Sequence, residues 1–178
     1  PVVELSYSKV TGENLNTFSI EGSYAALDAL NNESYPIYSK LHGDFMYRNI
    51  KNLSEDLQAN DEQLKNCFLA AANRFGMVVS GYSGRDRNVM QMFEAALDFP
   101  NAFPKGIFWT VPNIKFVEEY AIKFIHKARS KGVKASIVET GTYDELLSKI
   151  WRQTTNKPDE LSDKVKLQSK TKVSIPLS

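Results

Sequence analysis

Between residues 60 and 152, the apolar side chains follow two spacings in turn. Stretches with apolar residues three or four positions apart predict helices, and they cover residues 60–75, 89–97, 116–128 and 142–151. Short continuous apolar runs, rich in β-branched residues, predict strands buried on both faces. These runs cover residues 77–80, 107–111 and 133–138. Helices and strands therefore alternate along this part of the chain.

Alternating helices and strands predict a parallel sheet, because parallel strands need a crossover connection that is usually a helix. The fold class is accordingly α/β, with a doubly wound parallel sheet. Asn60 or Asp61 is the expected N-cap of the first helix. Thr142 and Glu145 have the spacing of a capping box, which opens the last helix.

The chain before residue 60 is weakly patterned. It predicts a short helix over 23–30 and a short strand over 37–41. From residue 154 the chain is polar and rich in lysine, which is typical of a linker or tail. The domain organisation expected is an N-terminal segment of the same domain (1–36), the main α/β domain (37–153) and the tail (154–178).

Four polar turns follow predicted strands and should meet at one edge of the sheet. In open α/β sheets, ligands bind beyond the carboxyl ends of the strands. The turns cover residues 42–44, 81–86, 110–113 and 140–144. This edge is therefore the expected binding site.

The turn at 81–86 (Gly-Tyr-Ser-Gly-Arg-Asp) carries the most information. Its glycines allow a ligand to approach the backbone, and the N–H groups of the helix that follows attract phosphate. The Ser83 hydroxyl can donate to a phosphate or ribose oxygen. No Gly-Lys-Thr follows, so this is not a Walker loop. An ordinary strand-to-helix turn with Asp86 as N-cap explains the same residues equally well.

His42 is the candidate general acid or base of the predicted edge. A histidine titrates near pH 6.5, so it can exchange a proton at neutral pH. A loop histidine without a role is the alternative interpretation. His126 is expected on the solvent face of its helix, and Thr142 is explained by capping alone as well as by a ligand. Trp109 lies within an apolar run and is expected in the core.

Composition and charge exclude several functions. Twenty-two basic and 21 acidic residues give a net charge of +1, so no basic field favours nucleic acid or membrane surfaces. No apolar run has the roughly 18 residues that a membrane span needs. One cysteine, Cys67, and two histidines predict neither a disulfide nor a zinc site. These features favour the cytoplasm.

Four segments, in this order and spacing, resemble a known family. They are Lys-Leu-His-Gly-Asp at 40–44, Val-Ser-Gly-Tyr-Ser-Gly-Arg-Asp at 79–86, Gly-Ile-Phe-Trp at 106–109 and Thr-Tyr-Asp-Glu-Leu-Leu at 142–147. Together they resemble the second half of a sirtuin-like domain of the bacterial branch associated with anti-phage defence. The resemblance covers residues 37–152.

The resemblance implies a Rossmann-like domain of the DHS-like NAD-binding type, with NAD as its ligand. It implies that His42 is the catalytic residue for hydrolysis of the nicotinamide–ribose bond. The resemblance assigns five positions to NAD binding. In the turn, Gly81, Tyr82 and Ser83 would contact the ribose and phosphates, and Thr142 and Tyr143 would lie at the adenine end.

The chain also departs from the family pattern. It lacks the Gly-Ala-Gly-x-Ser and Thr-x-Asn segments that normally precede His-Gly, and it lacks the zinc-binding cysteines of deacetylating sirtuins. The expectation is therefore the C-terminal part of a longer NAD hydrolase, inactive as an isolated fragment and partnered by other domains of that chain. A homo-oligomer is also possible.

Two alternatives remain open. One is a non-catalytic module that senses NAD or ADP-ribose. The other is a Rossmann-like interaction domain with no ligand, whose turn at 81–86 is purely structural.

Overall fold

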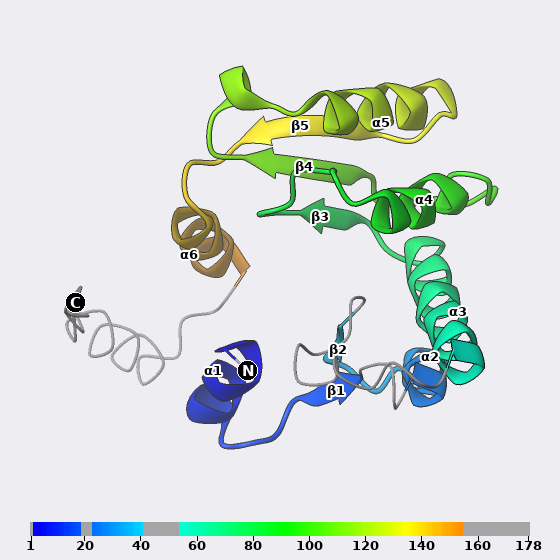
Figure 1. Ribbon diagram of the computed structural model, residues 1–178. Coiled ribbons are helices and arrows are strands. Elements are labelled where there is room, and N and C mark those ends of the chain that lie inside the picture. Colours follow the sequence, from blue (N-terminus) through cyan, green and yellow to red (C-terminus); the bar gives the residue numbers. More distant parts are fainter. Residues whose placement is uncertain (1, 19–22, 41–53, 155–178) are drawn as a thin grey trace, which may run out of the picture. The chain divides into compact units, whose positions relative to one another are not determined.

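The computed structural model of the protein describes residues 2–18, 23–40 and 54–154 (Figure 1). The described helices are α1 (Val2–Thr11), α2 (Ser23–Asn31), α3 (Ser54–Ala72), α4 (Arg87–Ala96), α5 (Glu119–Ser130), α6 (Tyr143–Thr154) and the short 3₁₀ helix η3 (Ile114–Phe116). The described strands are β1 (Asn16–Phe18), β2 (Ile37–Ser39), β3 (Met77–Val79), β4 (Ile107–Val111) and β5 (Ala135–Glu139). One compact unit spans Leu15–Tyr143, while α1 and nearly all of α6 belong to a second.

Strands β3, β4 and β5 form a parallel sheet in that order (Figure 1). Val79 pairs with Trp109, and Trp109 pairs with Ile137, so the three strands end near the same edge. Strands β1 and β2 form a separate parallel pair. The predicted α/β class with a parallel sheet, consistent with a Rossmann-like fold, is confirmed.

The amino edge of the three-stranded sheet is closed by direct contact between backbones. The Met77 amide donates to the Gly106 carbonyl (2.9 Å), and the Ile107 amide donates to the Lys134 carbonyl (2.8 Å). Gly106 has a φ of +90°, and a Cβ at this position would lie 2.8 Å from the Lys134 carbonyl oxygen. Only glycine fits both the backbone conformation and the space.

A cluster of aromatic rings packs between one face of this sheet and helices α4 and α5; we call it the aromatic core. The Phe93 ring centroid lies 5.1 Å from that of Phe68, 5.4 Å from Phe124, 5.9 Å from Trp109 and 6.5 Å from Phe103. Trp109 is 1% exposed, which confirms its predicted core position. Such ring pairs add about 0.5–1.5 kcal/mol each beyond the apolar area that they bury.

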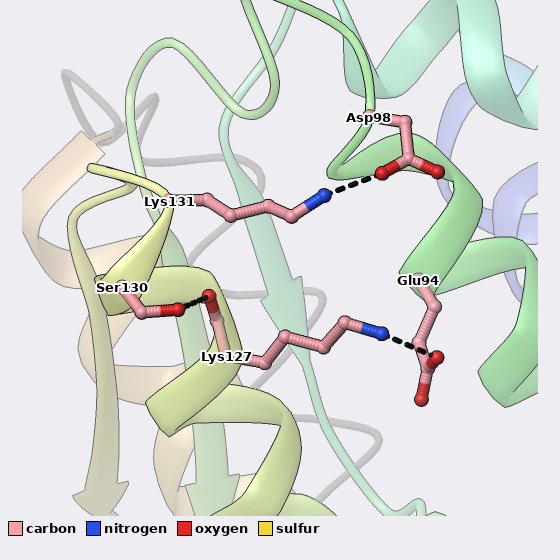
Figure 2. A network of polar contacts seen from close by, with 5 residues as sticks. All are labelled: Glu94, Asp98, Lys127, Ser130 and Lys131. Carbon is pink, nitrogen blue, oxygen red and sulfur yellow. Dashed lines mark hydrogen bonds and ion pairs between the residues drawn. The ribbon is translucent and has the colours of Figure 1, made fainter.

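Ion pairs join α4 to α5 along their solvent side (Figure 2). The Lys127 ammonium lies 2.7 Å from a Glu94 carboxylate oxygen, and the Lys131 ammonium pairs with Asp98. The hydrogen bond and charge of Lys131 hold the pKa of the Asp98 carboxyl below its usual value. Exposed pairs of this kind stabilise little, so the aromatic core carries most of the packing energy between these helices.

A second cluster, which we call the small core, lies between α2 and α3. Its buried members are Ala26, Leu30, Leu64 and Cys67. Burial raises the pKa of the Cys67 thiol. A pocket of about 330 Å³ adjoins this cluster and is lined mainly by apolar side chains of α2, β2 and α3.

Helix α3 belongs to both cores. Leu64 and Cys67 face the small core, while Phe68 and Ala72 pack against the aromatic core. Beyond the helix, the Arg74 guanidinium donates to the Leu30 carbonyl (3.1 Å), which ties α3 to the C-terminus of α2. The two cores are thus joined through one helix.

Most predicted elements appear where the hydrophobic pattern placed them, with three differences. Helix α3 begins at Ser54 and not at Asn60 or Asp61, because the polar helix formers of its first turns hide the apolar period. Helix α1 and strand β1 were not predicted. Phe116 was expected on the apolar face of α5 but lies in η3 and is 81% exposed.

Other expectations concern single side chains and segments. His126 is exposed on α5, as predicted. The predicted tail lies, apart from Thr154, outside the described residues. Within the described parts of the chain, no helix combines the length and the apolar character needed to cross a membrane.

Candidate functional site

A pocket of about 410 Å³ lies beyond the carboxyl ends of β3 and β4. Its volume is within the range of small-molecule sites, roughly 300–1,000 Å³. It is lined by the turn after β3, the end of β4 and the segment that leads into α5. The lining residues are Gly81, Tyr82, Ser83, Trp109, Thr110, Val111, Pro112, Asn113, Phe116, Val117, Glu118 and Ala121. This is the edge at which the sequence predicted a binding site.

The turn after β3 has a backbone conformation that its glycines permit. Gly84 has a φ of +82°, and a Cβ there would lie 3.3 Å from the Tyr120 Cβ and 3.5 Å from the Met90 sulfur. A side chain at this position would therefore be strained and crowded at once. The close packing brings the turn against α4 and α5.

Strand β4 fixes the position of this turn through two side chains. The Trp109 indole N–H donates to the Tyr82 carbonyl (3.2 Å), and the Tyr82 ring centroid lies 5.7 Å from that of Trp109. The buried Thr110 hydroxyl donates to the Val79 carbonyl (2.9 Å) just before the turn. The turn that lines the pocket is thus held in place by the core.

The N-terminus of α4 is capped by Asp86. One Asp86 carboxylate oxygen accepts from the amides of Asn88 (2.9 Å) and Val89 (3.1 Å). The capping role that the sequence offered for Asp86 is therefore confirmed. The amides of Asn88 and Val89, at the start of α4, are thus already bonded, while Ser83 places a hydroxyl in the lining of the pocket.

The opposite rim of the pocket is the segment that follows β4. The Asn113 side chain accepts from the Lys115 amide (2.9 Å), and its carbonyl accepts from the Phe116 amide (3.1 Å). A Glu139 carboxylate oxygen from β5 accepts from the Ile114 amide (2.8 Å). These contacts fix η3 beside the pocket.

Two polar groups adjust the electrostatics of the pocket. The Glu118 carboxylate pairs with the Arg85 guanidinium, which joins the turn after β3 to the start of α5. The Tyr82 hydroxyl donates to the Asp86 carbonyl (3.1 Å). Burial, followed by the nearby Asp86 charge, raises the pKa of Tyr82.

The structure brings together part of the predicted site. Gly81, Tyr82 and Ser83 all line the pocket. Thr142 and Tyr143 follow β5 and are not among the described lining residues, and the Tyr143 side chain is 57% exposed.

The remaining predictions concern the other turns. The Thr140 amide donates to the carbonyl of Val111, a lining residue, so the turn after β5 starts next to the pocket (3.0 Å). His42 lies outside the described residues, so its position stays a prediction. The strand expected before it, β2, pairs with β1 and belongs to a separate sheet from β3, β4 and β5, so the expectation that its turn shares their edge is not confirmed.

Sequence reasoning did not assign roles to several lining residues. Trp109 was predicted in the core, but its contact with the turn was not, because an indole in an apolar run carries no sign of a polar role. Phe116 was assigned to a helix face by its spacing from Tyr120 and Phe124. The polar turn at 110–113 was the available signal for Asn113.

A comparison with known families matches residues 3–132 to the SIR2-like domain. The match includes the turn at 81–86 and strands β3 and β4, and it ends before Thr142. Comparison with curated proteins found no match. SIR2-like domains generally bind NAD. Because the match covers well over half of the chain, the resemblance to a sirtuin-like domain is confirmed, and this chain belongs to the SIR2-like domain family.

Proposed function

We propose that this chain is the NAD-binding part of a SIR2-like enzyme that hydrolyses NAD to ADP-ribose and nicotinamide in anti-phage defence. The observation that carries the proposal is the pocket of about 410 Å³ beyond β3 and β4, lined by the turn residues Gly81, Tyr82 and Ser83. Ligands bind at this edge in parallel α/β sheets. Membership in a family that generally binds NAD gives the ligand class.

The chemistry of the lining suits part of a dinucleotide. The turn offers backbone amides and the Ser83 hydroxyl to ribose and phosphate oxygens. The indole of Trp109 and the side chains of Val111 and Val117 give the pocket an apolar wall. A lining that combines polar groups with apolar side chains suits a nucleotide, which has a charged diphosphate and flat bases.

In the proposed reaction, NAD is the substrate. The bond between nicotinamide and C1′ of the ribose breaks, nicotinamide leaves with the bonding electron pair, and water adds to C1′. The water loses one proton, which the imidazole of His42 accepts as a general base. The role of His42 rests on its match to the family's His-Gly motif.

The two histidines of the chain provide a matched test. The full-length protein is incubated with NAD, and the release of nicotinamide is followed for the wild type, His42→Ala and His126→Ala. Loss of turnover in His42→Ala alone is the expected result, because His126 is exposed on α5. Equal turnover by wild type and His42→Ala would remove His42 from the mechanism.

The isolated chain is proposed to bind NAD but to turn over little of it, since it lacks two family segments that precede His-Gly. The other domains of a longer cytoplasmic protein would complete the pocket. A ligand that binds only the native state raises the melting temperature. A rise with millimolar NAD is therefore expected, whereas no shift would favour an interaction domain without a ligand.

A second candidate function is the sensing of NAD or ADP-ribose without turnover. Among the described lining residues, Glu118 supplies the one carboxylate, and it is paired with Arg85. The Tyr82 hydroxyl is likewise bonded, to the Asp86 carbonyl. Saturable NAD binding by the full-length protein with no nicotinamide release would favour this function over hydrolysis.

A further inference from the structure

Phe116 presents an apolar ring to solvent at the mouth of the pocket. It is 81% exposed and is also a lining residue. Leaving a phenylalanine side chain in water forgoes about 1.5–3 kcal/mol of burial energy. Ile114 (55%) of the same turn and Tyr120 (57%) at the start of α5 are exposed as well but are not among the described lining residues.

The backbone that carries Phe116 is held rigidly. Its amide donates to the Asn113 carbonyl, and the Asn113 side chain caps the same turn at the Lys115 amide. Glu139 anchors the turn to β5 through the Ile114 amide. The exposed ring is therefore presented by a structured turn that is tied to the sheet.

The position of the ring relative to the polar groups indicates what it contacts. The polar turn at Gly81–Ser83 forms one side of the pocket, and the segment that carries Phe116 forms another. A nucleotide held by its ribose and phosphates at the turn would extend its flat base across the pocket. The base would then have an aromatic face within reach.

We propose that Phe116 is the stacking platform for a planar base of the bound dinucleotide. This inference rests on the proposed function and deepens it by naming the residue that recognises the base. Stacking on an aromatic side chain needs no particular hydrogen-bond pattern, because every base has a π face. Either adenine or nicotinamide supplies this chemistry.

The test is isothermal titration of the full chain with four ligands. They are NAD, ADP-ribose, nicotinamide mononucleotide and ribose 5-phosphate, which respectively carry both bases, adenine alone, nicotinamide alone and no base. Phe116→Ala removes the ring, Phe116→Trp keeps a stacking face, and Ile114→Ala is the matched control, since Ile114 is exposed on the same turn. Circular dichroism verifies that every variant folds.

The expected result is a Kd for NAD about 10-fold higher in Phe116→Ala than in wild type, from the usual strength of base–aromatic stacking. Phe116→Trp and Ile114→Ala should stay within about 2-fold of wild type. The loss of affinity in Phe116→Ala should appear with only one of ADP-ribose and nicotinamide mononucleotide, and this identifies the base that stacks on the ring. The Kd for ribose 5-phosphate should be the same in wild type and Phe116→Ala.

Other outcomes overturn the proposal, and they do so separately from the proposed function. If wild type and Phe116→Ala bind NAD with the same Kd, Phe116 has no stacking role, while the proposal that the chain binds NAD still stands. If wild type binds none of the four ligands, both the proposed function and the stacking role are wrong. If sedimentation shows that Phe116→Ala converts an oligomer to a monomer, the ring covers a subunit interface and the proposal is wrong.

Discussion

The aromatic core and the small core fill the space between their elements with side chains of different size. The aromatic core fills the space between the sheet and two helices with large rings, and Trp109, Phe103 and Phe124 are at most 2% exposed. The small core between α2 and α3 has smaller buried members, Ala26, Leu30, Leu64 and Cys67, and a pocket of about 330 Å³ lies beside it.

The difference shows where the candidate site obtains its rigidity. The aromatic core reaches the pocket directly, since the same Trp109 that packs against Phe93 also donates to the Tyr82 carbonyl. In the part of the chain that the structure describes, the small core is joined to the aromatic core through α3 and has no residue in the lining of this pocket. We therefore expect the two regions to differ in stability, and substitutions in each can measure that difference.

The largest effect is expected from Phe93→Ala in the aromatic core. Phe93 contacts four other rings and is 5% exposed, so its removal leaves a cavity that rigid neighbours cannot fill. The free energy of unfolding should fall by about 3–5 kcal/mol. Urea denaturation followed by circular dichroism measures it, and a loss under about 1 kcal/mol would show a core that repacks freely.

Leu64→Ala is the matching change in the small core. Leu64 is 2% exposed, but it lines the pocket of about 330 Å³, so the site can relax around a deletion. The expected loss is about 2–3 kcal/mol, at the lower end for a buried leucine. A loss equal to that of Phe93→Ala in the same urea titration would erase the contrast between the cores.

Trp109→Phe tests the connection between the aromatic core and the pocket. The phenyl ring keeps most of the packing but cannot donate to the Tyr82 carbonyl, so the turn loses one anchor. We expect the free energy of unfolding to fall by about 1 kcal/mol for the lost hydrogen bond, with a further loss for the smaller buried ring, and the Kd for NAD to rise. Trp151→Phe in α6 is the control, and identical NAD titrations for both variants would contradict the anchoring role.

The smallest effect is expected from the Cys67 thiol at alkaline pH. Its raised pKa means that the unfolded thiol ionises first, near pH 8.5, while the native thiol stays protonated. The contribution of this thiol to the free energy of unfolding is thus fully present below about pH 8.5, and it decreases as the pH rises toward the native pKa. Urea midpoints between pH 7.5 and 9.5 should show this slope in wild type and lose it in Cys67→Ala.

The sequence predicted the part of the fold in which each element carries its own hydrophobic signature. Strand β4 is a continuous apolar run, and α4 has a clear apolar face, so both were found close to their observed bounds. Helix α1 was missed because its apolar side chains, such as Val2 (76%) and Leu5 (59%), are exposed and form no buried stripe.

The site was predictable only where backbone chemistry marks it. Gly81 and Ser83 stand in a turn whose residue types suggest a ligand, and they do line the pocket. Phe116 has helical spacing in the sequence, but the backbone is extended at Val117 and Glu118, and this separates the turn that carries Phe116 from α5. Apolar lining residues carry no chemical sign that distinguishes a pocket from a core.

The contact of Gly106 with the Lys134 carbonyl gives the two ends of the sheet different tolerances for change. At the amino end, the backbones touch, and one added carbon atom already meets an obstacle. At the carboxyl end, a Cβ at Gly81, just after β3, would meet nothing within 4 Å, and the turn borders a pocket there. Lengthened loops that alter ligand preference can therefore be grafted after β3 or β4, while the junctions before β4 and β5 must keep their present length.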